Sequence, residues 1–543
     1  MGPYHRRCCH LLQRTLFTNS TIAPNLLPEH LTKGCIPRID FSDSAIAYSS
    51  KSFPQLLRSL LVFSTCQVPF IVKNSETMMK TSYKVLGPAI TNTAMNMSFF
   101  GHFCAGETET TIKPTVDYLM KNGVGSILDY AAEADVEDDK DKTAAATATE
   151  ATIATSGKPK VFSARIYDYK NEAMCDVHKK TFEKCIDAVK AVSPIGFAAI
   201  KCTALGDPEL LKRASTALTE VRKLFVEFDE TKSGFLTEQQ FDKAYSKFFK
   251  GGDAHKLFDK IDVSHDGKID YIEWSNGLPL EELHLLTAHC RSNGPLSRSV
   301  LDHNEREMLK RMRERIYGLA QQAQNLRVRL MVDAEHTYFQ PAIDNITIDL
   351  AKRYNKDFPA IFSTYQMYLK DSRLRLFTDI ERAHKGGYKF AAKLVRGAYM
   401  VLERHHAEAE GLEDPINENI NVTHENYNSA VREVISKIAS GRDIEIMIAS
   451  HNQRSIELTL DAMREHKLSP SAGVYFGQLL GMSDHLTFSL GKHGFKAYKY
   501  VPYGRINEVM PYLIRRAQEN ADALGGAKNE LRMTKSEISR RVF

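Results

Sequence analysis

The stretch Ala497-Tyr-Lys-Tyr-Val-Pro-Tyr-Gly-Arg-Ile-Asn-Glu-Val-Met-Pro-Tyr-Leu-Ile-Arg-Arg-Ala-Gln-Glu-Asn520 joins a short apolar segment to an amphipathic helix through a Pro/Gly turn. Tyr512, Arg515, Arg516 and Glu519 stand at i, i+3, i+4 and i+7, so they share one face of that helix. Two guanidiniums beside a phenol suit a planar anion such as a carboxylate, because arginine offers fixed, paired donors. The alternative is a solvated basic patch on a surface helix.

Upstream of this stretch, short apolar segments alternate with helical ones from Val124 onward, as expected of repeated βα units and a parallel sheet. The sequence offers nine candidate strands, one more than an eight-stranded barrel needs, so one of the first two is expected to be an extra element. The open, doubly wound sheet is the alternative, but no GxGxxG follows any strand. The candidate strands are Ser126–Asp129, Val161–Tyr167, Phe197–Thr203, Arg329–Asp333, Ala360–Tyr365, Ala392–Val395, Glu445–Ala449, Val474–Phe476 and Ala497–Val501.

The candidate strands share a change from apolar to polar residues at their carboxyl ends. In a parallel βα barrel these ends form the rim where sites are built. One polar residue there is an ordinary loop residue, but a succession of them favours an active-site rim. They are Asp129, Lys201, Asp333–Glu335, Gln366, Arg396–Tyr399, His451 and Gln478.

The chain has 543 residues and a net charge of +5, which gives no case for nucleic acid as a partner. Its nine cysteines include no CxxC pair, so a reducing compartment is favoured over a disulfide framework. The first acidic residue is Glu29, and the preceding segment carries Arg6, Arg7 and Arg14. Residues 1–25 are therefore interpreted as a mitochondrial presequence, the alternative being an unstructured basic tail. No apolar run reaches the ~20 residues of a membrane span, so any membrane contact is expected to be peripheral.

The rest of the chain divides by pattern. Residues 26–122 are expected to form an N-terminal helical arm. The barrel starts at 123–206, includes a disordered loop over the charged and Ala/Thr-rich residues 135–160, and resumes at 291–543. Residues 207–290 interrupt it as an insert.

The insert contains a pattern typical of an EF-hand calcium loop, with Gly267 at the sharp turn. A partner loop starts at Asp229 but has Gln240 in place of the final glutamate, so it is expected to bind calcium weakly or not at all. The alternative is a relic EF-hand pair kept for packing. The predicted metal-ligating positions are Asp262, Ser264, Asp266, Lys268, Asp270 and Glu273.

Taken together, these segments resemble proline dehydrogenase, the flavin-dependent enzyme of proline catabolism, in its mitochondrial animal form. The resemblance covers about residues 50–525, insert included. The blocks that carry it include Phe99-Phe-Gly-His-Phe-Cys-Ala-Gly-Glu107, Ile127-Leu-Asp-Tyr130, Ala199-Ile-Lys-Cys-Thr-Ala-Leu-Gly206, Met331-Val-Asp-Ala-Glu-His-Thr-Tyr-Phe-Gln-Pro341, Thr364-Tyr-Gln-Met-Tyr-Leu-Lys370, Lys393-Leu-Val-Arg-Gly-Ala-Tyr399, Ser450-His-Asn452 and Tyr475-Phe-Gly-Gln-Leu-Leu-Gly-Met482.

The resemblance implies an α/β fold, a (βα)8 TIM-type barrel with a helical arm and an EF-hand-like insert, holding FAD over its carboxyl-terminal rim. Catalytic roles are implied for Lys201, Asp129, Tyr500, Arg515 and Arg516. Substrate contacts are implied for Leu394, Ala398, Tyr399, Tyr500, Tyr512, Arg515 and Arg516. Cofactor contacts are implied for Asp333, Gln366, Lys393, Val395, Gly397, Ser450, His451 and Gln478, together with Glu519, which would orient the arginine helix.

The implied reaction is oxidation of L-proline to Δ1-pyrroline-5-carboxylate by hydride transfer to flavin N5, with electrons passed to ubiquinone. The implied location is the matrix face of the mitochondrial inner membrane. Two alternatives stay open: oxidation of trans-4-hydroxy-L-proline, and a calcium-binding regulatory protein on an inactive barrel. Tyr500 favours proline, since the hydroxyproline relatives tend to carry a smaller serine there. Calcium is expected at the second loop only, and the oligomeric state is left open.

Overall fold

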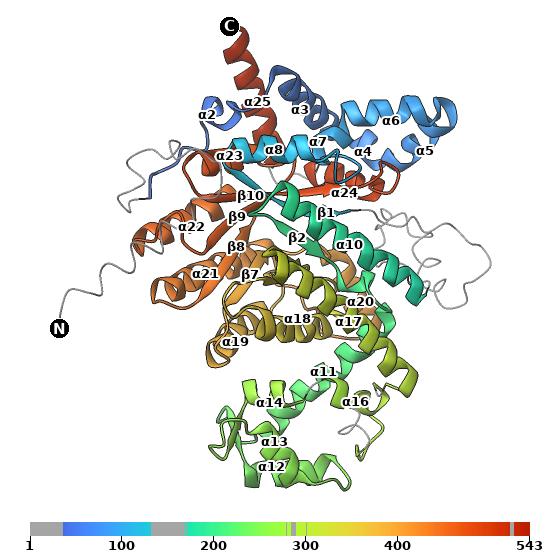
Figure 1. Cartoon of the computed structure of the whole chain (residues 1–543), viewed down its shortest axis with the longest axis vertical. Coiled ribbons are helices and arrows are strands. Elements are labelled where there is room, and N and C mark those ends of the chain that lie inside the picture. The colour runs from blue at the N-terminus through green and yellow to red at the C-terminus, as the bar shows by residue number, and fades with distance from the viewer. Residues whose placement is uncertain are drawn as a thin grey trace, which may run out of the picture.

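The computed structural model describes residues 36–131, 169, 171–278, 280–283, 289–299, 301–521 and 526–543 (Figure 1). The predicted presequence (residues 1–25), the predicted disordered loop (135–160) and the candidate strand Val161–Tyr167 lie outside these residues.

A closed barrel of parallel strands forms the centre of the molecule, in the order β1-β10-β9-β8-β7-β6-β5-β2. The seam closes where β1 pairs with β10 over its full length, from Val124↔Ala497 to Tyr130↔Tyr503. The predicted TIM-type barrel is therefore confirmed, and the open-sheet alternative is excluded. The strands are β1 (Val124–Tyr130), β2 (Phe197–Ile200), β5 (Arg329–Val332), β6 (Ile361–Gln366), β7 (Phe390–Val395), β8 (Ile444–Ala449), β9 (Val474–Leu479) and β10 (Lys496–Tyr503).

The barrel interior is a packed core at its amino-terminal end. Phe197 is fully buried there and meets Phe362, Tyr475 and Tyr498 edge-on, with ring centroids 5.0–5.7 Å apart. Such edge-to-face pairs are favourable and fill the narrow interior. Because these rings occupy the lower part of the barrel, only the carboxyl-terminal end can accept a ligand.

Helices cover the outside of the sheet between successive strands (Figure 1). Each presents an apolar face to the strands, as in α10, where Cys185, Ile186 and Val189 are buried. These helices are α10 (Glu172–Val192), α11 (Pro208–Phe228), α17 (His303–Leu326), α18 (Gln340–Tyr354), α19 (Ser372–Lys385), α20 (Met400–Glu410), α21 (Ile420–Ala439), α22 (Gln453–Glu465) and α23 (Asp484–Lys492).

The N-terminal arm forms one end of the molecule, at the top of Figure 1. Its helices α3, α4 and α7 contact α24 (Met510–Ala521), the helix of the opening stretch, and α2 and α3 contact the last helix, α25 (Gly526–Val542). The arm contains α2 (Ser44–Tyr48), α3 (Phe53–Cys66), α4 (Pro69–Lys73), α5 (Ser75–Val85), α6 (Gly87–Met97), α7 (Phe99–Phe103) and α8 (Lys113–Lys121).

The insert forms the opposite end of the molecule (Figure 1). Its two loops are joined by an antiparallel pair, β3 with β4, in the register Leu236↔Ile269. Trp274 packs in its aromatic core and donates from Nε1 to the Val221 carbonyl of α11 at 2.8 Å. Helix α11 starts the predicted insert and also packs on the barrel helix α18, so this bond ties the two loops to the barrel. The insert elements are β3 (Phe235–Thr237), α12 (Glu238–Phe248), α13 (Ala254–Ile261), β4 (Lys268–Asp270) and α14 (Tyr271–Gly277), followed by the short helices η3 (Leu280–Glu282) and α16 (Pro295–Arg298).

Candidate active site

Polar side chains converge where the barrel strands end. Asp129 comes from β1, Asp333 follows β5, and Gln366 ends β6. A single-turn 3-10 helix, η2 (Cys202–Ala204), begins directly after Lys201 at the end of β2. Since these strands are neighbours in the closed barrel, their ends form one continuous rim. The rim predicted from the sequence is therefore a real feature of the fold.

The centre of the rim is the carboxylate of Asp333. Its Oδ1 accepts from Lys393 Nζ at 2.6 Å, and its Oδ2 lies 3.5 Å from Lys201 Nζ. The Tyr500 hydroxyl donates to the same Oδ2 at 3.1 Å, and Lys393 Nζ lies 5.5 Å from the centre of the Tyr500 ring. Two lysines and a phenol from three different strands thus share one carboxylate.

The electrostatics of this cluster keep Asp333 ionised. Burial by itself would raise the pKa of the carboxyl, but the charges of Lys393 and Lys201 and the hydroxyl of Tyr500 outweigh it and hold the pKa below its usual value. On the other side, Lys201 Nζ lies 4.0 Å from Asp129 Oδ1, and Asp129 is 2% exposed. Lys201 therefore lies between two carboxylates, one from β1 and one that follows β5.

Glu335 is a buried acid next to this cluster that the sequence analysis placed on the rim without a role. It accepts from the Thr203 backbone N–H at 3.1 Å and from the Thr203 hydroxyl, and burial raises its pKa. The Gln366 side chain donates to the Glu335 carbonyl at 2.9 Å. Glu335 therefore fixes β2 against β5 and orients Gln366.

The strands β8 and β9 contribute neutral polar groups. Gln478 donates to the Ser450 carbonyl at 3.1 Å and accepts from the Thr487 hydroxyl at 2.8 Å. His451 Nδ1 lies 3.0 Å from the Ser483 hydroxyl. Burial, with the nearby charges of Lys499 and Arg516, lowers the pKa of His451 to about 3, so this imidazole is neutral at pH 7.

Arg396, just after β7, is a structural residue that sequence reasoning did not assign. It donates from NH1 to the Ser450 hydroxyl at 2.7 Å and from NH2 to the Ser455 hydroxyl at 2.8 Å. Its guanidinium also lies 4.4 Å from the centre of the Tyr427 ring. Arg396 thus links the end of β7 to β8 and α22.

Along β7 the side chains alternate between the barrel and the surrounding helices. Lys393 points inward to Asp333, whereas Leu394 packs with Tyr365 and Tyr427 in the core between sheet and helices. The expectation that Leu394 lines the substrate ring pocket is corrected: the strand pleat turns its side chain away from the barrel interior. Val395 ends the strand and is half-buried.

The loop after β7 is the open side of the rim. Gly397 and Ala398 are exposed, and Tyr399 is half-buried. Gly397 has φ 141°, and an added Cβ would lie 2.5 Å from the Tyr368 ring, so only glycine fits there. The Tyr399 ring lies against His336, 4.3 Å between centroids.

Helix α24 covers the rim. Tyr512 and Leu513 pack with Ala131, directly after β1, and with Val62 and Phe103 of the arm. Arg516 is 8% exposed, lies 4.8 Å from the centre of the Tyr512 ring, and donates from NH2 to Glu519 at 2.5 Å. Among the described residues its Nε has no hydrogen-bond partner.

That unsatisfied donor is a feature expected of a carboxylate-binding arginine, because a buried N–H without an acceptor is costly. Arg515 is half-buried on the same helix. The rim below offers a cationic donor in Lys393 and amide, hydroxyl and imidazole groups in Gln366, Gln478, Ser450 and His451. This donor set fits the polar edge and phosphates of a flavin dinucleotide.

The insert loop places its acids less favourably for a metal. Asp262 accepts from the Asp266 and Gly267 N–H groups at 3.3 and 3.0 Å, while Asp270 caps α14 and pairs with Lys385 of α19. Over the described part of the chain, no three His, Cys, Asp or Glu side chains gather closely enough to hold a metal ion. The predicted ligand set is therefore not assembled in this structure, because its side chains satisfy the loop's own backbone and a barrel lysine.

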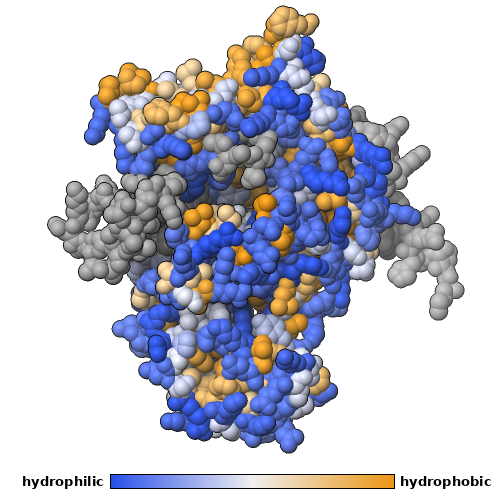
Figure 2. All heavy atoms as spheres, turned by 180° about the vertical axis from the view of Figure 1, so that it is seen from behind, coloured by the Kyte–Doolittle hydropathy of each residue, from blue (hydrophilic) through white to orange (hydrophobic). Residues whose placement is uncertain are grey.

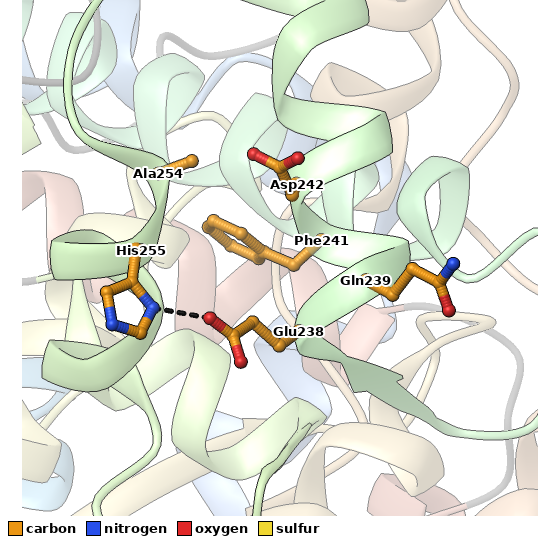
Figure 3. Close-up of a pocket in the computed structure, with 6 residues that line it drawn as sticks. All are labelled: Glu238, Gln239, Phe241, Asp242, Ala254 and His255. Carbon is orange, nitrogen blue, oxygen red and sulfur yellow. Dashed lines mark hydrogen bonds and ion pairs between the residues drawn. The ribbon is translucent and has the colours of Figure 1, made fainter.

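A hollow on the insert surface lies between α12 and α13 (Figure 3), at the end of the molecule opposite the arm (Figure 1). His255 and Glu238 pair at its edge, as the dashed line in Figure 3 marks, and both side chains are mostly exposed. Phe241 forms its floor. Because the His255–Glu238 pair is solvated, and His255 also faces the exposed Asp259 at 3.6 Å, we assign this hollow no catalytic role.

Comparison with known proteins gives a consistent result. The family model described as proline dehydrogenase matches residues 112–529. Mitochondrial proline dehydrogenase 1 of Bos taurus is 36% identical over 95% of this chain and 91% of its own length, and that of Homo sapiens is 37% identical over 93% and 90%. Hydroxyproline dehydrogenase of Xenopus laevis is 31% identical over 93% of this chain and 91% of its own.

Among solved structures, proline utilization A (PutA) from Bdellovibrio bacteriovorus superposes with a TM-score of 0.52 at 16% identity. The match covers 89% of this chain and 38% of that protein, so this chain corresponds to well under half of it. At this identity the likeness supports the barrel fold alone.

Proposed function

Because this chain belongs to the proline dehydrogenase family, we propose that its rim oxidises L-proline to Δ1-pyrroline-5-carboxylate with FAD as the bound cofactor. The chain is an oxidoreductase acting on proline, and the family is FAD-dependent in general. The observation that carries the residue assignment is the Asp333 carboxylate held between Lys393, Lys201 and Tyr500 under the arginine helix. Bound FAD would supply the acceptor for the hydride that leaves C5 of proline.

The residues of this chain bind and orient. Lys393, Gln366 and Asp333 would hold the isoalloxazine edge, and Ser450, His451 and Gln478 would contact the rest of the cofactor. Gly397 and Val395 would also contact the cofactor. A neutral His451 donates one hydrogen bond without adding charge, whereas Lys393 places a cation where negative charge develops on reduction.

The substrate would lie between the rim and α24. Arg515 and Arg516 would pair with its carboxylate, Glu519 would orient Arg516, and Tyr500 and Tyr512 would pack against the ring. Ala398 and Tyr399 would close the open side. Fixing both the carboxylate and the ring brings C5 to the attack distance that hydride transfer requires.

One experiment tests the reaction. The purified protein should be yellow, and L-proline should bleach it under anaerobic conditions as the flavin is reduced. A colourless protein that cannot be reconstituted with FAD would instead favour the calcium-binding scaffold on an inactive barrel.

The hydroxyproline alternative is decided at Tyr500. Its hydroxyl is tied to Asp333 Oδ2 at 3.1 Å, which fixes the ring and leaves little freedom for a substituent on C4. The greater identity to proline dehydrogenase 1 points the same way. We expect a higher kcat/KM for L-proline than for trans-4-hydroxy-L-proline; the reverse order would overturn the assignment.

The relatives are named as mitochondrial, which supports a mitochondrial location. We propose further that this chain works at the matrix face of the inner membrane and passes its electrons to ubiquinone. No helix of the described ranges is long and apolar enough to cross a bilayer.

Calcium at the second insert loop is a separate proposal. Asp262, Asp266, Asp270 and Glu273 supply the charge that a hard cation needs, with Ser264 and the Lys268 carbonyl completing the set. Binding would require Asp270 to leave Lys385. Calorimetry tests it: no heat at millimolar calcium, with Glu273→Gln matching the wild type, would refute it.

A further inference from the structure

The outer two helices of the arm are barely covered by the rest of the protein. Helix α5 buries no residue, and α6 buries only Thr91. They form an antiparallel pair that contacts the body through α4 and α7. In Figure 2, hydrophobic side chains gather over this part of the arm, at the upper left.

The exposed apolar residues follow helical periodicity. On α6, Ile90 and Met97 stand seven residues apart and are 59% and 70% exposed. On α5 and its end, Met78 and Val85 repeat the spacing, at 42% and 75%. Side chains at this spacing share one helical face. Each helix therefore shows an apolar stripe to solvent.

Helix α3 adds a third stripe. Phe53, Leu57 and Leu61 stand four residues apart and are 41%, 45% and 55% exposed, while Leu56 and Val62 are buried on the opposite face. Phe70 on α4 is 71% exposed. Helices α3 to α6 contact one another in succession, and this many exposed large apolar side chains on neighbouring helices favours an interaction surface over ordinary scatter.

The charge around these stripes is positive. From residue 53 to residue 97 the chain holds four basic residues and a single acid, Glu76, which is paired with Lys80 at 2.8 Å. Lys73 ends α4 and Lys84 lies in the last turn of α5. Apolar stripes bordered by lysine are the composition of helices that lie in the interface of an anionic membrane. Two copies of such a face would repel each other.

The inner side of the same arm packs on α24, the helix that carries Arg515 and Arg516. Val62 and Cys66 of α3 pack in one hydrophobic cluster with Tyr512 and Leu513 of α24. A partner bound to the outer side of the arm is thus separated from α24 by a single layer of helices.

We propose that the outer surface of the arm docks peripherally on an anionic phospholipid membrane. This surface, called the arm face, consists of Phe53, Leu57, Leu61, Phe70, Val85, Ile90 and Met97. This proposal rests on the proposed function, since a lipid-soluble acceptor would be met there. The face would sit at headgroup depth, with its lysines against lipid phosphates.

Vesicle flotation tests it with the full-length protein. The vesicles are phosphatidylcholine alone, or phosphatidylcholine with about one fifth anionic phospholipid. The test variant is Val85→Ser/Ile90→Ser/Met97→Ser. The matched control is Val226→Ser/Leu374→Ser, whose side chains are 70% and 74% exposed on α11 and α19, away from the arm. All five positions are exposed, so folding should be preserved, as a thermal melt verifies.

We expect the wild type and the control to float with anionic vesicles, and the test variant to lose about tenfold or more of its binding. With a soluble dye as electron acceptor all three should oxidise proline equally, whereas turnover with vesicle-embedded quinone should fall in the test variant alone. Equal flotation of all three proteins would overturn the proposal. So would a test variant whose subunit number in solution falls while its vesicle binding is unchanged, because a second copy would then be the occupant. A wild type inactive even with the dye would refute the proposed function, and flotation would still decide the arm face.

Discussion

The substitution Asp333→Asn tests the charge cluster most directly. It keeps the size of the side chain but removes the negative charge that lies 2.6 Å from Lys393 Nζ and 3.5 Å from Lys201 Nζ. With an effective dielectric constant of ~20, the lost attractions are about 6 and 5 kcal/mol. Desolvation already offsets much of that sum, and breaking a buried pair costs about 3–5 kcal/mol in practice.

The loss of stability also has an upper limit for each lysine. A lysine with an ordinary pKa of ~10.4 can give up its proton at pH 7 for about 4.6 kcal/mol, so it becomes neutral before the penalty grows further. We therefore expect Asp333→Asn to lower the free energy of unfolding by about 3–5 kcal/mol at pH 7, measured by urea titration. The kcat/KM for proline should fall as well, since Tyr500 loses its charged acceptor.

The pH dependence has a defined sign. The pKa of Asp333 is lowered in the folded protein, so its contribution is complete above the unfolded value of ~3.9 and is lost as the pH falls through the folded pKa. In the variant the penalty comes from charged lysines, so the difference from wild type should shrink as the pH rises toward ~10.

Asp484 provides a matched control. Its carboxylate also lies between two buried lysines, 2.6 Å from Lys51 Nζ and 2.7 Å from Lys499 Nζ, and neither lysine belongs to the Asp333 cluster. Asp484→Asn should cost similar stability and leave the flavin-reduction step with proline nearer to wild type. The reasoning is refuted if Asp333→Asn changes neither stability nor kcat/KM, or if both variants impair flavin reduction equally.

Further predictions concern the substrate site and the buried histidines. Arg515→Met and Arg516→Met should each raise the KM for proline by an amount equivalent to about 2–4 kcal/mol, because a desolvated carboxylate loses a charged partner; unchanged KM values in both would contradict the clamp. Tyr500→Ser should raise kcat/KM for trans-4-hydroxy-L-proline relative to proline, and steady-state kinetics on the two substrates measures the ratio. Burial lowers the pKa of His102 and His451 to about 3 and that of His485 to about 4, so the unfolded chain binds more protons below its ordinary value of ~6.5. Stability should therefore fall with decreasing pH by up to about 1.4 kcal/mol per pH unit for each histidine, and replacing His485 with Asn should flatten that slope.

The positions of the strands and of the polar residues at their ends could be predicted from the sequence, because each βα unit is formed by a continuous segment of the chain. Apolar segments bounded by turns predicted the positions of β5, β6 and β8 to within one or two residues, and Lys201 and Gln366 lie at the strand ends as expected. Whether an individual strand side chain points into the barrel or toward the surrounding helices could not be predicted. Parallel barrel strands are apolar on both faces, so Leu394 carries no signal that distinguishes inside from outside.

The partners of the rim residues were equally hidden. Glu335 meets Thr203 across 132 positions, and Arg396 meets Ser450 across 54. Such contacts depend on which strands become neighbours, which no local pattern specifies. In the insert, the loop pattern itself is clear in the sequence. The sequence does not show, however, that Lys385 of a barrel helix pairs with Asp270 of that loop.

The buried lysine pair of Asp484 also connects the arm to β10. Lys51, between α2 and α3 of the arm, lies 2.6 Å from Asp484, and Asp484 in turn pairs with Lys499, the neighbour of Tyr500 on β10. Arg541 of α25 donates to the Lys51 carbonyl at 2.7 Å, so the last helix fixes the same point. The two ion pairs of Asp484 are nearly solvent-free, so removing this carboxylate would leave two buried lysines without it. The arm is therefore bonded to the strand that carries Tyr500, and a membrane that bound the arm face would hold the substrate site at a fixed orientation to its surface.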